Sequence, residues 1–318
     1  KRENIDLPEA ELVYRTVRDM NLSKLVSQDV PLFLSLLADL FPGMSPPSKG
    51  EYPEEERILA KVIEKEGLIY HDSWVLKVIQ LYETTKVRHG IMLVGPSGGG
   101  KSSIFKCLKE TLQEKDNIQY KDARFNPKAF RAQEMYGETD PMSGEWTTGV
   151  FAAMWAKFNN RNNAYNTWII ADGPVDAIWI EDLNTVLDDN QILTLANGDR
   201  MPMTDNVKMM FEVETLVNAS PATVSRAGII YVSDTDLGWA PVLESWVRKR
   251  DSSRQECLRA MVKKWLGDCT PSDPGPCFSF LSRHTNEIMV EGRVGKITSF
   301  AQLFQGLTEG TGSELSPS

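Results

Sequence analysis

The sequence predicts an α/β fold in which a parallel sheet forms the core and helices flank it. Two short, strongly apolar segments, at 90–95 and 168–172, have the pattern of buried parallel strands. A glycine-rich turn and a helical pattern at 101–115 follow the first of them. Strand and helix patterns continue to alternate, as expected for a sheet covered on both faces. Further strands are predicted at 118–125, 208–214 and 228–232, a helix at 177–189, and a β-hairpin with an Asn-Gly turn over 193–203.

Helical patterns precede and follow this core. Residues 9–41 carry apolar side chains at helical spacing, and a segment rich in Pro, Gly and Ser at 42–56 is the first clear linker. Beyond the core, the helical patterns at 240–249 and 254–266 predict a small helical subdomain. Two more helices are predicted at 54–66 and 72–87.

Composition limits the classes of function. The chain has 318 residues, 41% of them hydrophobic and 25% charged, which is enough for a sizeable core. Its net charge of −9 does not indicate a nucleic-acid surface. Four cysteines without a Cys-x-x-Cys pair and three histidines indicate neither a zinc site nor a disulfide framework. No apolar run approaches the ~18 residues of a membrane-spanning helix, so we expect no membrane contact.

Residues Gly95–Ser102 match the phosphate-loop pattern G-x-x-x-x-G-K-[ST]. In such a loop, backbone N–H groups approach the phosphates of a nucleotide, and the following helix directs its positive end toward them. Lys101 is expected to reach the β- and γ-phosphates, and the Ser102 hydroxyl to bind Mg²⁺. The predicted strand before the loop and the predicted helix after it are the context that the motif requires. The expected nucleotide-binding residues are Gly95, Pro96, Ser97, Gly98, Gly99, Gly100, Lys101 and Ser102.

The second apolar strand ends in Asp172, the expected partner of the loop in holding Mg²⁺, with capping of the next turn as its alternative role. In many ATPases of this type the next residue is a glutamate that activates the attacking water, but here it is Gly173. Glycine cannot accept a proton, so the sequence predicts nucleotide binding with little or no hydrolysis. Asp176 and Glu181 are the nearest substitutes, although the helix predicted to begin near Asp176 should carry both away.

The segment NASPATVSRAG at 218–228 follows another predicted strand. Ser220 stands where such a strand often presents a polar residue to the γ-phosphate or the water, and capping the turn before Pro221 fits the pattern equally well. Arg226 precedes an Ala-Gly turn and is a candidate arginine finger for the site of a neighbouring module. A structural or solvated arginine is the alternative.

These segments together resemble the second AAA+ module, AAA2, of the dynein heavy chain. The resemblance covers roughly residues 10–250, and the run SPATVSR is more similar to axonemal than to cytoplasmic dyneins. Three consecutive glycines, Ala227 and Thr148 depart from the family pattern, which more often has a single glycine pair, Cys and Asp at these places. The segments that carry the resemblance are 18–43, the loop LVGPSGGGKS, 126–150, 168–203 and 209–232.

The resemblance implies an AAA+ P-loop NTPase with β-hairpin inserts at 126–150 and 190–207 and a small α-helical lid. In the family this module binds ATP (or ADP) with Mg²⁺ but is not expected to hydrolyse it, and its second acidic position is glycine, as at Gly173. Arg226 would complete the hydrolytic site of the first module in trans. The implied domains are 1–50, a helical segment from the junction with the preceding module; 51–236, the large nucleotide-binding subdomain; and 237–318, the lid.

The resemblance also implies partners and a location. The partners are the neighbouring AAA+ modules and the linker of the same heavy chain, and the dynein intermediate and light chains through the full heavy chain. No direct contact with nucleic acid, membrane or microtubule is implied. The location is the cytoplasm and cytoskeleton, with the axoneme of a cilium or flagellum. Two other interpretations stay open: an independently active AAA+ ATPase with a non-standard general base, and an interaction module whose nucleotide site is vestigial.

Overall fold

The computed structural model describes residues 8–25, 28–43, 52–267, 275–285 and 292–311. These residues form two compact units. The first unit comprises Lys1–Leu59, Leu76–Gly95 and Lys101–Ser233, and the second comprises Ala60–Val75, Pro96–Gly100 and Asp234–Ser318.

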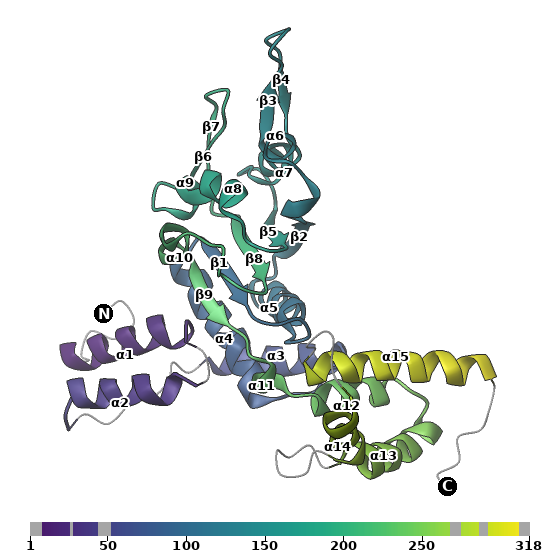
Figure 1. Cartoon of the computed structure of the whole chain (residues 1–318). Coiled ribbons are helices and arrows are strands. Elements are labelled where there is room, and N and C mark those ends of the chain that lie inside the picture. Colours follow the sequence, from purple (N-terminus) through teal and green to yellow (C-terminus); the bar gives the residue numbers. More distant parts are fainter. Residues whose placement is uncertain (1–7, 26–27, 44–51, 268–274, 286–291, 312–318) are drawn as a thin grey trace. The chain divides into compact units, whose positions relative to one another are not determined.

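A five-stranded parallel sheet forms the centre of the first unit (Figure 1). Its strand order is β2-β5-β8-β1-β9, and every pairing within it is parallel. The chain's first strand therefore lies inside the sheet, and the carboxyl ends of all five strands meet at one edge. The strands are β1 (Gly90–Val94), β2 (Gln119–Phe125), β5 (Tyr165–Asp172), β8 (Val207–Val213) and β9 (Gly228–Tyr231), as the sequence predicted to within a few residues.

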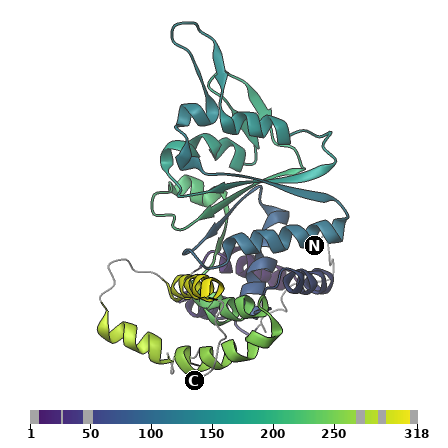
Figure 2. The same ribbon diagram turned by 90° about the vertical axis from the view of Figure 1, so that its right-hand side faces the viewer.

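Helices cover both faces of this sheet (Figure 2). Successive side chains of a strand point to opposite faces, so each inner strand supplies two sets of core residues. One set, with Phe211 among its members, packs in one core with Phe151 and Trp155 of α7 (Val150–Phe158). The other set includes Trp168, whose ring meets Phe105 of α5 (Lys101–Asp116) edge-on at 6.3 Å between centroids. Full burial of a large apolar side chain stabilises a fold by about 1.5–3 kcal/mol, and these residues are almost fully buried.

Two β-hairpins extend from the first unit at the two places that the sequence predicted (Figure 1). One pairs β3 (Gly137–Thr139) with β4 (Trp146–Thr148), after the short helices η1 (Pro127–Ala129) and α6 (Ala132–Tyr136). The other pairs β6 (Ile192–Thr194) with β7 (Arg200–Pro202). Its turn contains Gly198 at a φ of +91°, a conformation that glycine adopts without strain.

The prediction of one continuous helix at 177–189 is wrong. The structure has three short turns there: α8 (Ala177–Ile180), η2 (Glu181–Leu183) and α9 (Asn184–Leu187). The carbonyl of Trp179 accepts a hydrogen bond from the Tyr136 hydroxyl at 2.5 Å. Asp182 and Asn184 also compete with the helical backbone for hydrogen bonds, which makes a continuous helix less favourable. Tertiary contacts therefore override the helical pattern.

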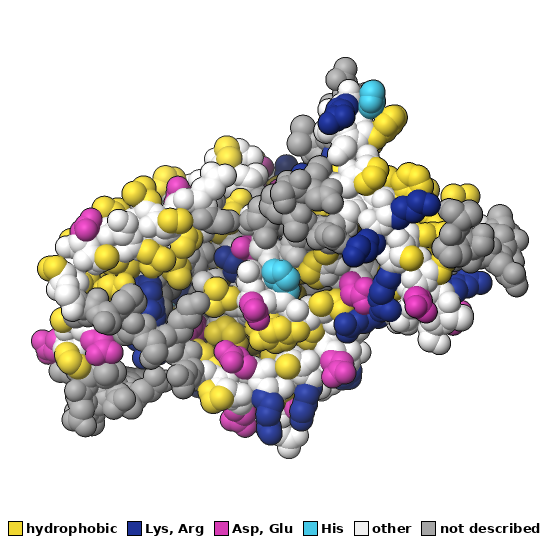
Figure 3. Space-filling view, turned by 90° about the horizontal axis from the view of Figure 1, so that it is seen from below, with side chains coloured by type: hydrophobic (Ala, Val, Ile, Leu, Met, Phe, Trp, Pro, Cys, Tyr) yellow, Lys and Arg dark blue, Asp and Glu magenta, His cyan; other side chains and the backbone are white. Residues whose placement is uncertain are grey.

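In the described part of the chain before the first strand there are four helices: α1 (Glu9–Leu22), α2 (Val30–Leu40), α3 (Pro53–Lys65) and α4 (Asp72–Val87). All four lie where the sequence predicted helices. α1 and α2 contact each other, with Tyr14 and Phe41 edge-on at 5.3 Å between centroids. Hydrophobic side chains gather on the surface over these two helices, on the left of Figure 3. Leu32, Leu36 and Leu40 of α2 are among the exposed ones.

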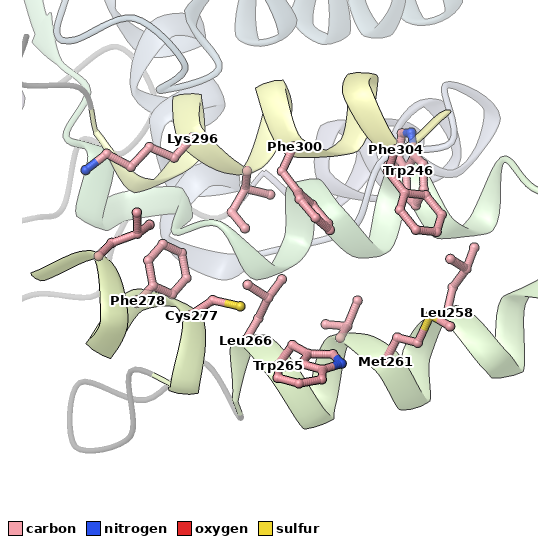
Figure 4. Close-up of a pocket in the computed structure, with 13 residues that line it drawn as sticks. Trp246, Leu258, Met261, Trp265, Leu266, Cys277, Phe278, Lys296, Phe300 and Phe304 are labelled. Carbon is pink, nitrogen blue, oxygen red and sulfur yellow. The ribbon is translucent and has the colours of Figure 1, made fainter. Parts of the chain in front are cut away.

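The second unit is mainly helical. Its core includes Trp239, Leu243 and Ile297. A largely apolar cavity of about 320 Å³ has Trp265, Cys277 and Phe300 in its lining (Figure 4).

No helix in the described ranges is both long and apolar enough to cross a membrane. The C-terminal helices of the second unit include α12 and α13, which were predicted, and α11, α14 and α15, which were not. Their bounds are α11 (Asp234–Leu237), α12 (Ala240–Arg248), α13 (Ser252–Leu266), α14 (Gly275–His284) and α15 (Arg293–Thr311).

Candidate functional site

The carboxyl edge of the sheet brings together residues that lie far apart in the sequence. Asp172, the last residue of β5, and Glu212, the last but one of β8, are direct partners in the strand register. Arg124, near the end of β2, is the register partner of Ile170, which lies on the same face of β5 as Asp172. Ser102 lies in the first turn of α5 and contacts Glu212. This edge is where ligands bind in open α/β sheets.

The loop between β1 and α5 has a backbone that only glycine can form at several positions. Gly98 and Gly100 have φ values of +84° and +83°. A Cβ atom on Gly100 would lie 2.7 Å from Nε1 of Trp74, and one on Gly95 would lie 1.9 Å from the carbonyl oxygen of Val232. These φ values and close approaches explain Gly95, Gly98 and Gly100 of the loop, which the sequence predicted to bind phosphate.

Lys101 is the buried cation of the site, with only 8% of its surface exposed. Its Nζ donates a hydrogen bond to the Gly95 carbonyl oxygen at 2.7 Å. Burial lowers the pKa of Lys101, and the negative charges of Glu212, Glu214 and Asp172 act against that shift. The ammonium group therefore lies in the field of three carboxylates.

A chain of polar contacts connects α5 to three strands. The Ser102 hydroxyl donates to Oε1 of Glu212 at 2.6 Å. Arg124 Nη1 donates to Oε2 of Glu212 at 2.8 Å and to Oδ2 of Asp172 at 2.7 Å. Burial alone would lower the pKa of Arg124, but its bonds to Asp172 and Glu212 outweigh burial and raise it. One guanidinium therefore holds the two carboxylates together.

The donor set fits a nucleotide with its metal ion. Ser102 and Asp172 supply hydroxyl and carboxylate oxygens, the hard ligands that Mg²⁺ takes. Lys101 supplies a positive charge, and the glycine backbone leaves room for phosphate oxygens to approach. The structure therefore brings Lys101, Ser102 and Asp172 to one edge of the sheet, as the sequence predicted.

Glu212 and Arg124 are site residues that the sequence analysis missed. Glu212 ends the apolar run of β8 just as Asp172 ends that of β5, and this parallel was an available signal. The residue predicted from this part of the sequence is Ser220, eight residues further along. Arg124 gave no local signal, because its partners are 48 and 88 residues away in the sequence.

Gly173 follows Asp172 and leaves the usual position of the water-activating glutamate without a side chain. A Cβ atom at this position would lie 2.8 Å from Oδ1 of Asn126, so neighbouring atoms occupy part of the space. Of the two proposed substitutes, Asp176 accepts a hydrogen bond from Ile178 N at 3.2 Å, and Glu181 is exposed in η2. Neither the hydrogen bond of Asp176 nor the exposure of Glu181 indicates a role as a general base.

Ser220 and Arg226 lie at the two ends of α10 (Pro221–Arg226). Ser220 Oγ accepts a hydrogen bond from Thr223 N at 3.3 Å, so it has the capping role that the sequence left open. Arg226 Nε donates to Oδ1 of Asp188, and 32% of the Arg226 side chain is exposed. A contact of Ser220 with a nucleotide and a trans role for Arg226 both stay predictions.

Comparison with known proteins agrees with this architecture. A family model described as the hydrolytic ATP binding site of the dynein motor region matches residues 1–102, and one for the AAA domain of the dynein-related subfamily matches residues 90–227. The parallel sheet flanked by helices is therefore an AAA+ fold.

Several curated proteins are similar over most of the chain. The dynein gamma chain of the flagellar outer arm from Chlamydomonas reinhardtii is 54% identical over 266 residues, 84% of this chain. Dynein axonemal heavy chain 5 of Rattus norvegicus is 47% identical over 268 residues, also 84% of this chain. The chain spans only 6% and 8% of the length of these two relatives.

Proposed function

Because the chain belongs to the axonemal dynein heavy chain family and forms an AAA+ region of it, we propose that it is the second AAA+ module and holds ATP (or ADP) with Mg²⁺ without hydrolysing it. Gly95–Ser102 and Asp172 would bind the nucleotide and its metal. The bound nucleotide would serve as a structural and regulatory ligand in a motor that moves along microtubules.

The observation that carries this proposal is the combination of a complete phosphate loop with Gly173. Lys101, Ser102 and Asp172 provide the binding groups at one edge of the sheet. The position next to Asp172 provides no proton acceptor. A ligand that binds only the folded state stabilises it by RT ln(1 + [L]/Kd), about 2.7 kcal/mol at a hundred times Kd. An uncleaved nucleotide would supply that stabilisation continuously.

The order of the family matches supports the second position in the heavy chain. Residues 1–102 are similar to a model named for the hydrolytic site, and the match to the AAA domain begins at residue 90. We therefore divide the chain into a junction segment at 1–50, a large nucleotide-binding subdomain at 51–236 and a helical lid at 237–318.

The proposed partners are the neighbouring AAA+ modules and the linker of the same heavy chain. Arg226 would act as an arginine finger in the site of the first module. Its place at the end of a short helix and its partly exposed side chain support this assignment. Intermediate and light chains would associate through other parts of the heavy chain, and the two relatives' flagellar and axonemal names support a location in the axoneme.

Nucleotide binding and turnover by the 318-residue chain test the proposal. We expect the purified chain to bind Mg-ATP and to release no phosphate above background over hours. Lys101→Ala should weaken binding and abolish the rise of the melting temperature in ATP, because it removes the cation that contacts the phosphates. Lys109→Ala is the matched control, since Lys109 lies on the same helix but pairs with Asp122.

Two outcomes would contradict the proposal. Steady phosphate release would favour the independently active ATPase, and its loss in Asp176→Ala or Glu181→Ala would identify the base. A chain that binds no nucleotide would favour the vestigial site.

A further inference from the structure

We propose that Glu212 is a positioning residue of the nucleotide site, which accepts a hydrogen bond from the Ser102 hydroxyl and so turns the Oγ lone pairs toward Mg²⁺. This inference rests on the proposed function, because it concerns the metal ion that accompanies the nucleotide. It assigns a role to a side chain that belongs to neither the phosphate loop nor the end of β5.

The hydrogen bond between Ser102 and Glu212 has a defined direction. A hydroxyl has one proton to donate and two lone pairs to offer, whereas an ionised carboxylate can only accept. At 2.6 Å between Ser102 Oγ and Glu212 Oε1, the serine is therefore the donor. Its lone pairs are left facing away from Glu212, which is what a metal-binding hydroxyl requires.

The carboxylate of Glu212 is held in a fixed position. Only 9% of Glu212 is exposed, and its other oxygen accepts from Arg124 at 2.8 Å. The planar guanidinium also binds Asp172 at 2.7 Å. Arg124 thereby holds Glu212 in place and offsets the repulsion between two carboxylates that are neighbours in the sheet register.

Orientation of Ser102 by Glu212 is a different role from general-base catalysis. Both oxygens of Glu212 already accept a hydrogen bond from a protein donor, one from Ser102 and one from Arg124. A general base needs an oxygen within reach of the attacking water. The role assigned to Glu212 is to orient a ligand of the metal, and this role is distinct from activation of the attacking water.

The test is the effect of Mg²⁺ on ATP affinity. The ratio of the ATP Kd in EDTA to the ATP Kd in excess Mg²⁺ is measured by calorimetry for the parent chain and for Glu212→Gln. Loss of a residue that orients a metal ligand typically costs about 10–100-fold in metal affinity. We expect the ratio to fall by about that factor, while the Kd in EDTA changes little.

A double-mutant cycle with Ser102→Ala tests whether Glu212 acts through Ser102. In the Ser102→Ala background, Glu212→Gln should reduce the ratio no further. Glu114→Gln is the matched control, because Glu114 is an exposed carboxylate on α5, the helix that carries Ser102. Glu212→Asp is the second variant, for use if Glu212→Gln does not fold. It keeps the negative charge that Arg124 binds, but its side chain is one methylene shorter, so it should also reduce the ratio.

An unchanged ratio in a folded Glu212 variant with a lowered melting temperature would overturn the inference, since Glu212 would then serve stability alone. Additive effects of Glu212→Gln and Ser102→Ala would overturn it as well. Failure of the proposed function has a different signature: the unsubstituted chain would bind no ATP, or would hydrolyse it.

Discussion

At the scale of single residues, Gly173 is part of a local arrangement as well as a missing carboxylate. Asn126 accepts a hydrogen bond from Lys128 N at 2.9 Å and caps the short helix η1. Its Oδ1 lies 2.8 Å from the position that a Cβ on Gly173 would take. The loop after β2 therefore occupies space that a glutamate at position 173 would need. The absence of a glutamate at position 173 and the placement of Asn126 therefore belong to the same packing arrangement.

Gly173→Glu alone should therefore fail to restore hydrolysis. We expect it to destabilise the fold by about 1–3 kcal/mol, the usual cost of inserting atoms into a packed site. Adding Asn126→Gly should recover part of that stability, because it removes the obstructing oxygen. Denaturant titration and phosphate release measure the two effects, with Gly173→Ala as the variant that adds only the Cβ. A Gly173→Glu chain as stable as its parent would contradict this packing argument.

At the scale of elements, a buried cluster joins α3, α4 and α5. Oε1 of Glu55 accepts hydrogen bonds from the Tyr82 hydroxyl at 2.7 Å and from Lys115 Nζ at 2.6 Å. Burial alone would raise the pKa of Glu55, but these two bonds outweigh it and lower the pKa to about 2. The same contacts raise the pKa of Lys115. The first turn of α3 is thus held by an ionised carboxylate.

Stability should consequently decrease in acid. Glu55 titrates at 4.5 in the unfolded chain and at about 2 in the folded one, so its contribution is complete above about pH 5 and is lost as the pH falls toward 2. Glu55→Gln should lower stability at pH 7 and flatten this dependence. The free energy of unfolding between pH 7 and pH 3 measures it, with the exposed Glu54→Gln as the control. Equal pH dependence in Glu55→Gln and its parent would refute the assignment.

The elements also show what the sequence could predict. β1, α5 and β5 were predictable because their apolar runs, glycines and terminal Asp172 are local signals. The three turns at 177–187 were not, since the bond from Tyr136 to the Trp179 carbonyl comes from a segment 43 residues away. Arg124 was not predictable for the same reason, because its role depends on strand order and register, which follow from packing of the whole sheet. Glu212 had a local signal, the carboxylate that follows the apolar run of β8.

At the scale of the whole molecule, the role proposed for Arg226 involves a larger assembly than this chain. The chain spans 6% of the Chlamydomonas reinhardtii relative, so any site completed in trans involves other parts of such a heavy chain. Within this chain, Arg226 is paired with Asp188. This ion pair restricts the position of the Arg226 side chain.

Arg226→Ala in the full heavy chain should slow ATP hydrolysis by about 10³-fold or more, the usual contribution of an arginine finger. Nucleotide binding by the 318-residue chain should be unaffected. Arg226→Lys should be nearly as slow, because lysine lacks the planar fork of donors. Steady-state hydrolysis by the full motor measures this, and Arg248→Ala is a control from a helix of the second unit. Full activity of Arg226→Ala would remove the trans assignment.

The edge strand β2 has a consequence for how the chain behaves in concentrated solution. An uncovered sheet edge can recruit strands from other molecules and start aggregation. Along β2, Asp122 pairs with Lys109, Arg124 binds Asp172, and Lys121 lies 3.6 Å from the centre of the Tyr165 ring. An incoming strand would have to bury these charges. Arg124, which binds Asp172 in the site, is therefore also one of the charged residues that protect the sheet from growing at this edge.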